Sequence, residues 1–125
     1  MEDLFHLLRA AWDARTCDPV DLPWSPENPS RGQCGVTALV LNDHLGGELL
    51  VAEVRYADGT TQGFHTWNRL PDGTEVDLTR EQFLPHEHVG EPRVVPRPEG
   101  PPRRCAEQYA LLAQRVRAAK AVAPS

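Results

Sequence analysis

The sequence predicts an α+β protein in which a buried helix packs on an antiparallel sheet, with a further helix near each end of the chain. Three observations lead to this fold class. Residues 36–41 form an apolar run that follows a turn-rich approach. Asp-Gly turns at 58–59 and 72–73 separate three extended segments. Apolar residues recur at helical spacing near both termini.

The chain has 125 residues and a formal net charge of -5. This length suits one domain, residues 1–125, with a single hydrophobic core. The acidic balance, without a Lys/Arg-rich block, argues against nucleic-acid or acidic-membrane partners. No apolar run approaches the roughly 20 residues that span a bilayer, and the N-terminus lacks the basic start of a signal peptide. We therefore expect a cytoplasmic protein that binds neither nucleic acid nor membrane.

The first predicted helix covers residue 2 to about residue 15, because its apolar side chains follow a helical period. These side chains are Leu4, Leu7, Leu8, Ala11 and Trp12. Residues 17–31 are rich in Pro, Asp, Asn and Ser and predict a long loop. That loop either covers a pocket or packs its aromatic residue, Trp24, on the core.

The central helix is expected to begin at Ser30. Ser30 and Gln33 have the spacing of a capping box, and Gly46-Gly47 supplies a stop. Cys34 would then lie in the first turn, where the helix dipole favours an anion. We expect this position to lower the pKa of the Cys34 thiol.

The middle of the chain predicts an antiparallel meander of three strands. In the second strand, alternation places Phe64 on one face and His65 and Trp67 together on the other. The three predicted strands are residues 49–56, 61–70 and 74–79.

The last third of the chain predicts a short helical turn, an irregular stretch and a long helix. Residues 80–83 form the turn, capped by Thr79. Residues 85–102 hold six prolines and form irregular surface or one short strand around 93–95. From Arg103 to about Val122 the sequence has the clearest helical pattern.

One set of residue types in this order has the chemistry of a cysteine hydrolase or acyltransferase. Such an enzyme needs a thiolate, a histidine that exchanges protons with it, and a group that orients the histidine. Cys34 opens a helix, and His65 and Asp77 nearly face each other across the turn at 72–73. A one-residue bulge would complete their match. The alternative is a His–Asp pair on the surface of a hairpin.

The three cysteines, Cys17, Cys34 and Cys105, form no C-x-x-C pair, which argues against a disulfide framework or a sulfur-rich zinc site. We interpret Cys17 and Cys105 as structural thiols, and a contact between them stays open.

A second candidate site is His86-Glu87-His88, where two imidazoles at i and i+2 have metal-ligand character. His65 or Asp77 would have to supply a further ligand. We interpret the segment as a solvated loop and expect no metal and no cofactor.

Three motifs, at residues 32–34, 65–68 and 72–79, resemble the core of the transglutaminase-like branch of papain-fold proteins. That branch has a G-Q-C helix start, an H-x-W strand and a D-x-T strand in this order. Together with residues 46–47 and 81–83, the pattern also resembles a small bacterial family of YunG type. The resemblance implies a papain-like core with Cys34 as nucleophile, His65 as general base and acid, and Asp77 orienting His65.

The resemblance also implies an oxyanion site at the backbone N–H of Cys34, with Gln33 or Trp24 as a second donor. Gln33 serves equally well as the capping-box residue. Trp67 is either a pocket wall or a core aromatic. Gly35 departs from the family, because transglutaminases usually carry an aromatic residue there, and its small size opens the wall beside the thiol.

Two functions follow. The first is acyl transfer from an amide- or peptide-containing substrate, through a thioester on Cys34, to water or to an amine. The second is a binding or regulatory module that keeps the scaffold without turnover. Three chemical groups in the expected order favour the enzyme.

Overall fold

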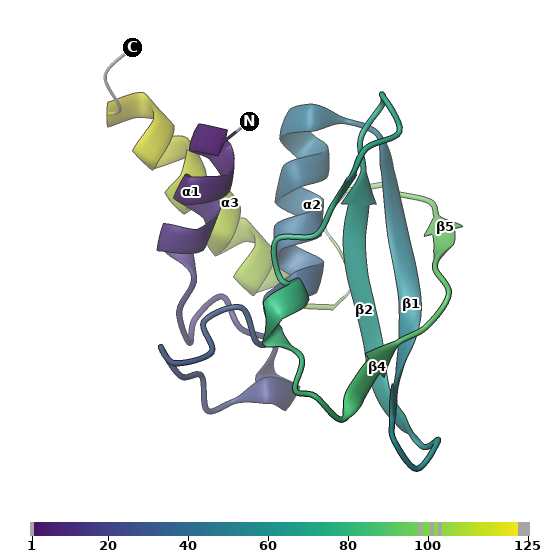
Figure 1. The fold of residues 1–125 in the computed structure, drawn as a ribbon. Coiled ribbons are helices and arrows are strands. Elements are labelled where there is room, and N and C mark those ends of the chain that lie inside the picture. The colour runs from purple at the N-terminus through teal and green to yellow at the C-terminus, as the bar shows by residue number, and fades with distance from the viewer. Residues whose placement is uncertain (1, 98, 101, 103, 123–125) are drawn as a thin grey trace.

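Three helices and one antiparallel sheet form successive layers in the computed structural model, which describes residues 2–97, 99–100, 102 and 104–122 (Figure 1). Helix α2 (Cys34–Leu45) lies next to the sheet. Helices α1 (Glu2–Ala11) and α3 (Ala106–Val122) lie together on the side of α2 away from the sheet. The structure confirms the predicted α+β class, with a helix near each end of the chain.

The sheet is built on two long strands joined by the first Asp-Gly turn. β1 and β2 pair along their whole length, and a bulge interrupts the ladder between Val54 and Arg55. The strand order is β3-β2-β1-β4, and β5 also pairs with β1. The bounds are β1 Glu48–Tyr56, β2 Thr61–Arg69, β3 Glu75–Val76, β4 Glu87–Val89 and β5 Arg93–Val95. The predicted meander is therefore confirmed, as is the short strand near residue 94.

Several predicted boundaries are wrong, each for a local reason. α1 ends at Ala11, because Asp13 and Thr16 form side chain–backbone hydrogen bonds that compete with the helix. α2 begins at Cys34 rather than Ser30, and it ends where Gly46 adopts a φ of 73°. β3 has two residues instead of six. The predicted start of the last helix, residue 103, lies outside the described residues, and α3 is helical from Ala106.

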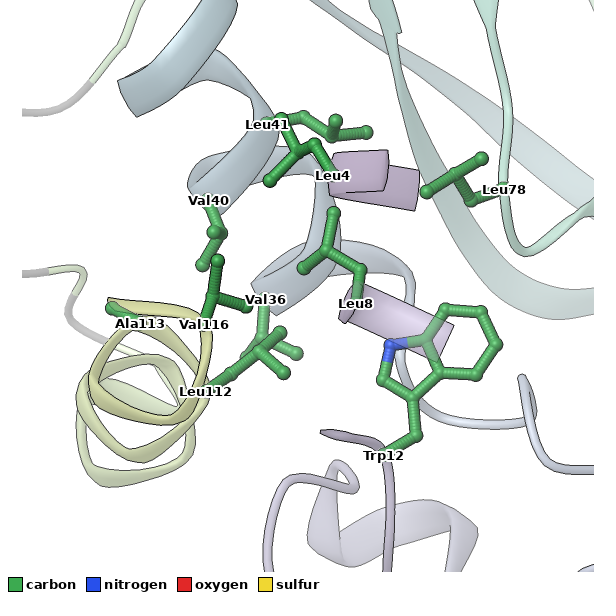
Figure 2. Close-up of a cluster of buried hydrophobic side chains, with 10 residues drawn as sticks. All are labelled: Leu4, Leu8, Trp12, Val36, Val40, Leu41, Leu78, Leu112, Ala113 and Val116. Carbon is green, nitrogen blue, oxygen red and sulfur yellow. The ribbon is translucent and has the colours of Figure 1, made fainter. Parts of the chain in front are cut away.

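The larger hydrophobic core fills the space between the three helices, and Figure 2 shows its side chains meeting there. Leu8, Val40, Leu112 and Val116 are fully buried in this cluster. Trp12, just beyond α1, donates from Nε1 to Thr37 Oγ1 at 2.9 Å. This bond fixes the chain after α1 against the first turns of α2.

A smaller cluster of Leu50, Ala52 and Trp67, with Val89 packed against it, lies on the sheet. Val89 belongs to β4, a strand that the sequence did not predict. The interpretation of residues 86–88 as a solvated loop is wrong for Glu87, which is 7 % exposed. His86 and His88 are exposed, and the His86 ring stacks on Tyr56. No described helix is long and apolar enough to cross a membrane.

Candidate active site around Cys34, His65 and Asp77

Cys34 is the first residue of α2, and a tightly packed loop delivers it there. Gly32 in this loop has a φ of 78°, a left-handed conformation that favours glycine. A Cβ atom on Gly32 would overlap Cys17 Sγ and would lie 3.0 Å from the Asp21 Cβ. The loop therefore approaches α2 along a path on which residue 32 has no room for a side chain.

Cys34 is half-buried and lines a cavity of about 490 Å³ between α2 and β2. From α2 the cavity is lined by Gly35, Val36 and Leu39, and from β2 by Phe64 and Thr66 among others. The volume falls within the range of small-ligand sites, roughly 300–1,000 Å³. Cys34 is thus a thiol at a helix N-terminus with open space in front of it.

Burial raises the pKa of the Cys34 thiol to about 11. Asp21 and Asp77 act in the same direction, because their charges disfavour a thiolate. The backbone N–H groups of Thr66 and Gly35 oppose this, because they lie near the sulfur and favour the thiolate. The expected lowering of the thiol pKa is therefore wrong: desolvation outweighs the helix N-terminus.

His65 and Asp77 form a direct pair. The fully buried His65 lies in β2, and its Nε2 is 2.7 Å from Asp77 Oδ2. Because an ionised carboxylate only accepts hydrogen bonds, Nε2 carries the proton and donates. No bulge interrupts the β2–β3 pairing; its register ends at Asn68 opposite Val76, and Asp77 reaches His65 diagonally.

Aromatic rings and a guanidinium surround this pair. Trp67 stacks on His65 with centroids 5.2 Å apart, and Phe83 meets it edge-on at 4.8 Å. Arg80 Nε donates to Asp77 Oδ2 at 2.6 Å, and Arg80 also covers the Trp67 ring. Burial raises the pKa of Asp77, but His65 and Arg80 together outweigh it and hold that pKa below its usual value.

The free nitrogen of His65, Nδ1, is buried and has no hydrogen-bond partner among the described residues. In a neutral ring whose Nε2 is protonated, Nδ1 is the basic atom. Buried polar atoms rarely lack a partner, and the exceptions call for an explanation. His65 therefore has an unused acceptor, held in place by its bond to Asp77.

No hydrogen bond joins Cys34 to His65 within the described residues. Asn68 points toward α2, because its Nδ2 donates to Ala38 O at 2.9 Å, and by alternation the His65 side chain leaves β2 on the other face. The Cys34 sulfur lies near the backbone N–H of Thr66, which projects in the plane of the sheet from the residue after His65. Phe83 touches His65 and also lines the cavity.

The residues expected from sequence at the oxyanion site or the pocket wall, Gln33, Trp24 and Trp67, each form hydrogen bonds within the fold. Gln33 is fully buried; it accepts from Thr16 Oγ1 at 2.8 Å and donates to Asp13 O at 3.1 Å. It therefore forms no capping box, and the Ser30 hydroxyl is left without a partner among the described residues. Trp24 donates to Pro29 O at 2.9 Å. Neither Gln33 nor Trp24 lines the cavity.

Trp67 is 4 % exposed and belongs to the smaller core cluster. Its Nε1 donates to Glu75 Oε1 at 2.8 Å. Trp67 is thus a core aromatic that also stacks on His65, rather than a residue of the cavity wall.

Sequence reasoning missed an ion pair that holds the loop before Cys34. Arg31 donates to both carboxylate oxygens of Glu87 at 2.8 and 3.2 Å, and the Glu87 side chain is 1 % exposed. Arg31 also contacts Asp21 and the Gln82 carbonyl. The position of Arg31 directly before Gly32-Gln33-Cys34 could have indicated a role in holding this loop. Nothing in the sequence indicates that its partner is Glu87, 56 residues away.

Comparison with known proteins identifies a family for this chain. Residues 1–121 match the family model described as YunG protein. The chain belongs to the YunG family. It is 34% identical over 92 residues to "Uncharacterized protein YunG" of Bacillus subtilis (strain 168), covering 71% of this chain and 70% of that relative. No solved structure matches. The predicted YunG resemblance is therefore confirmed.

The cysteines of this YunG-family chain are all free. Cys17 is buried beneath Gly32, and burial raises its pKa to about 11. Cys105, interpreted from sequence as structural, lines the same cavity as Cys34, and burial raises its pKa too. Cys105 directly precedes α3 and accepts from Tyr109 N, so both Cys34 and Cys105 lie at helix N-termini. Cys34 differs from the other two cysteines in lying beside the strand that carries His65.

Proposed function

We propose that this chain is a cysteine-dependent acyl-transfer enzyme with a papain-like, transglutaminase-like core. Its substrate would be an amide- or peptide-containing molecule. The observation that carries the proposal is the buried Nδ1 of His65, which has no hydrogen-bond partner among the described residues. Asp77 holds the His65 ring through Nε2, and the backbone N–H of the next residue, Thr66, lies near the Cys34 sulfur. Free cysteines are compatible with the cytoplasmic location that we also propose.

In this mechanism His65 Nδ1 accepts the proton of Cys34 as the sulfur attacks the substrate carbonyl. The backbone N–H of Cys34 stabilises the oxyanion, a role worth roughly 3 kcal/mol per donor in hydrolases. His65 then protonates the leaving amine, and water or another amine takes the acyl group from the thioester. Asp77 keeps the imidazole in the required tautomer.

The mechanism requires Cys34 and His65 to come within hydrogen-bond distance, and no such bond joins them among the described residues. Catalytic hydrogen bonds are often long without substrate and shorten when substrate binds. Phe83 is the side chain that would move, because it touches His65 and lines the cavity. The pKa of Cys34, about 11, makes a proton acceptor necessary near neutral pH.

Alkylation by iodoacetamide at about pH 6.5, with each cysteine followed by mass spectrometry, tests the proposal. Burial raises the pKa of all three thiols, so without a base all should react slowly. If His65 accepts the proton, Cys34 should react roughly tenfold or more faster than Cys105, and His65→Gln should abolish the difference. His88→Gln, a change at an exposed histidine, is the matched control. Equal rates at Cys34 and Cys105 would contradict the proposal.

A binding or regulatory module on the same scaffold is the second candidate. It is favoured by the raised pKa of Cys34 and by the absence, among the described residues, of a hydrogen bond between Cys34 and His65. In that case Cys34→Ala should leave the biological activity intact and a specific macromolecule should be recovered with the variant. Loss of activity in Cys34→Ala with unchanged folding would exclude this candidate.

A further inference from the structure

The cavity wall beside the thiol is bare. Gly35 follows Cys34 in α2 and lines the cavity, and a Cβ atom added to Gly35 would meet no atom within 4 Å beyond its chain neighbours and the nearby backbone of α2. The backbone at Gly35 does not require glycine, because its φ is not positive. The space next to the sulfur is therefore free for part of a ligand.

The surfaces around this space are apolar. Leu39 lies one helical turn after Gly35 and lines the same cavity. Across from α2, Phe64 lines the cavity and remains 61 % exposed, and Phe83 closes another side. Covering an exposed aromatic side chain with an apolar ligand lowers the free energy of the complex, because apolar surface is removed from water.

The charged residues of the cavity are already paired. Asp18 forms a bidentate ion pair with Arg104, and Asp21 lies 3.5 Å from Arg31. The Gln82 side chain is also engaged, since it accepts from Gly32 N and donates to Thr79 O. Of the described residues that line the cavity, none offers an unpaired charge to a ligand.

We infer that the acyl group carried by Cys34 is apolar and of medium size, such as a hexanoyl or arylalkyl group. It would lie over Gly35 against Leu39 and Phe64, with its carbonyl at the sulfur. This inference rests on the proposed acyl-transfer function and adds the substrate class to it. Gly35 becomes the residue that sets the size limit of the acyl group.

Activated esters test this directly on the full chain. A p-nitrophenyl ester acylates Cys34 as the new S–C bond forms and the C–O bond breaks, releasing p-nitrophenolate; the thiol proton passes through His65 to solvent. Burst release and the mass of acylated Cys34 would be compared for the acetate, the hexanoate and the adipate monoester. The adipate has the same six-carbon acyl chain but ends in a carboxylate.

Each buried methylene is worth roughly fourfold, so incomplete burial of four should still favour hexanoate over acetate by roughly tenfold or more. Hexanoate should also exceed the adipate monoester by roughly tenfold, because no unpaired cation awaits the carboxylate. Gly35→Leu should remove the preference for hexanoate, because it lowers the hexanoate rate by a larger factor than the acetate rate. Ala118→Leu, at an exposed position of α3, is the control for added bulk.

The outcomes distinguish a failure of the inferred substrate class from a failure of the proposed acyl-transfer function. Acylation of Cys34 by acetate with no preference for hexanoate, or equal rates for hexanoate and adipate, would overturn the substrate class alone. An equal loss for both neutral esters in Gly35→Leu would overturn the role of Gly35. Failure of every ester to acylate Cys34 in the folded wild-type chain would overturn the proposed function and this inference with it.

Discussion

The two faces of β2 hold their side chains in different ways. On one face, His65 and Trp67 are buried, stacked on each other and hydrogen-bonded to Asp77 and Glu75. On the other face, Phe64 is largely exposed and borders the cavity in front of Cys34. A single strand thus combines a rigid face, which fixes an imidazole, with an open face that leaves room for a ligand.

The largest expected effect is a difference in the loss of stability when a side chain is removed from one face or from the other. Trp67→Ala should destabilise the fold by about 4 kcal/mol, because it empties a packed site and leaves the Glu75 carboxylate without its donor. Phe64→Ala, three residues earlier on the open face, should change stability by less than about 0.5 kcal/mol. Urea unfolding of both variants measures the difference. Similar losses for the two would show that the faces are not distinct.

A second test concerns the loop that delivers Cys34 to the open face. Glu87→Gln should cost about 2 kcal/mol, because it removes the closer of the two carboxylates at the partly buried Arg31 guanidinium and leaves only Asp21, 3.5 Å away. Glu91→Gln, at an exposed position, should have almost no effect. Thermal unfolding gives the loss in stability, and hydrogen exchange should show its effect concentrated in residues 16–33. A uniform change across the chain would argue against a local anchor.

The smallest expected effect is the pH dependence of the rigid face. The pKa of Asp77 is lowered in the folded protein, so its ionised form stabilises the fold above about pH 4 and this contribution is lost as the pH falls further. Asp77→Asn should therefore cost about 1 to 2 kcal/mol at pH 7 and progressively less below pH 4. Glu27→Gln, in the exposed loop, is the control. A cost for Asp77→Asn that does not change with pH would exclude an ionised Asp77 as the source.

Local pattern was sufficient for the two long strands of the sheet. Alternation and two Asp-Gly turns predict β1 and β2 to within a residue, and they place His65 and Trp67 on one face. Contacts distant in sequence explain most of what was missed. The S-x-x-Q spacing predicts a helix start at Ser30, but the Gln33 amide binds Thr16 and Asp13 instead.

In the candidate site, too, local sequence pattern does not predict contacts between residues distant in sequence. The pairing of His65 with Asp77 follows from strand register, which a sequence pattern can indicate. The position of Cys34 beside β2 depends on how α2 packs on the sheet, through contacts such as Asn68 with Ala38. The raised pKa of Cys34 is likewise a product of burial, which the position in the helix does not reveal.

The contact between Gly32 and Cys17 couples two positions of the chain. A larger residue at 32 would push against the buried sulfur, and a bulkier residue at 17 would push the approach to α2 outward. Replacing Cys17 by alanine would relieve the crowding but not the left-handed backbone at 32. Residue 17 therefore helps to determine where the Cys34 sulfur lies.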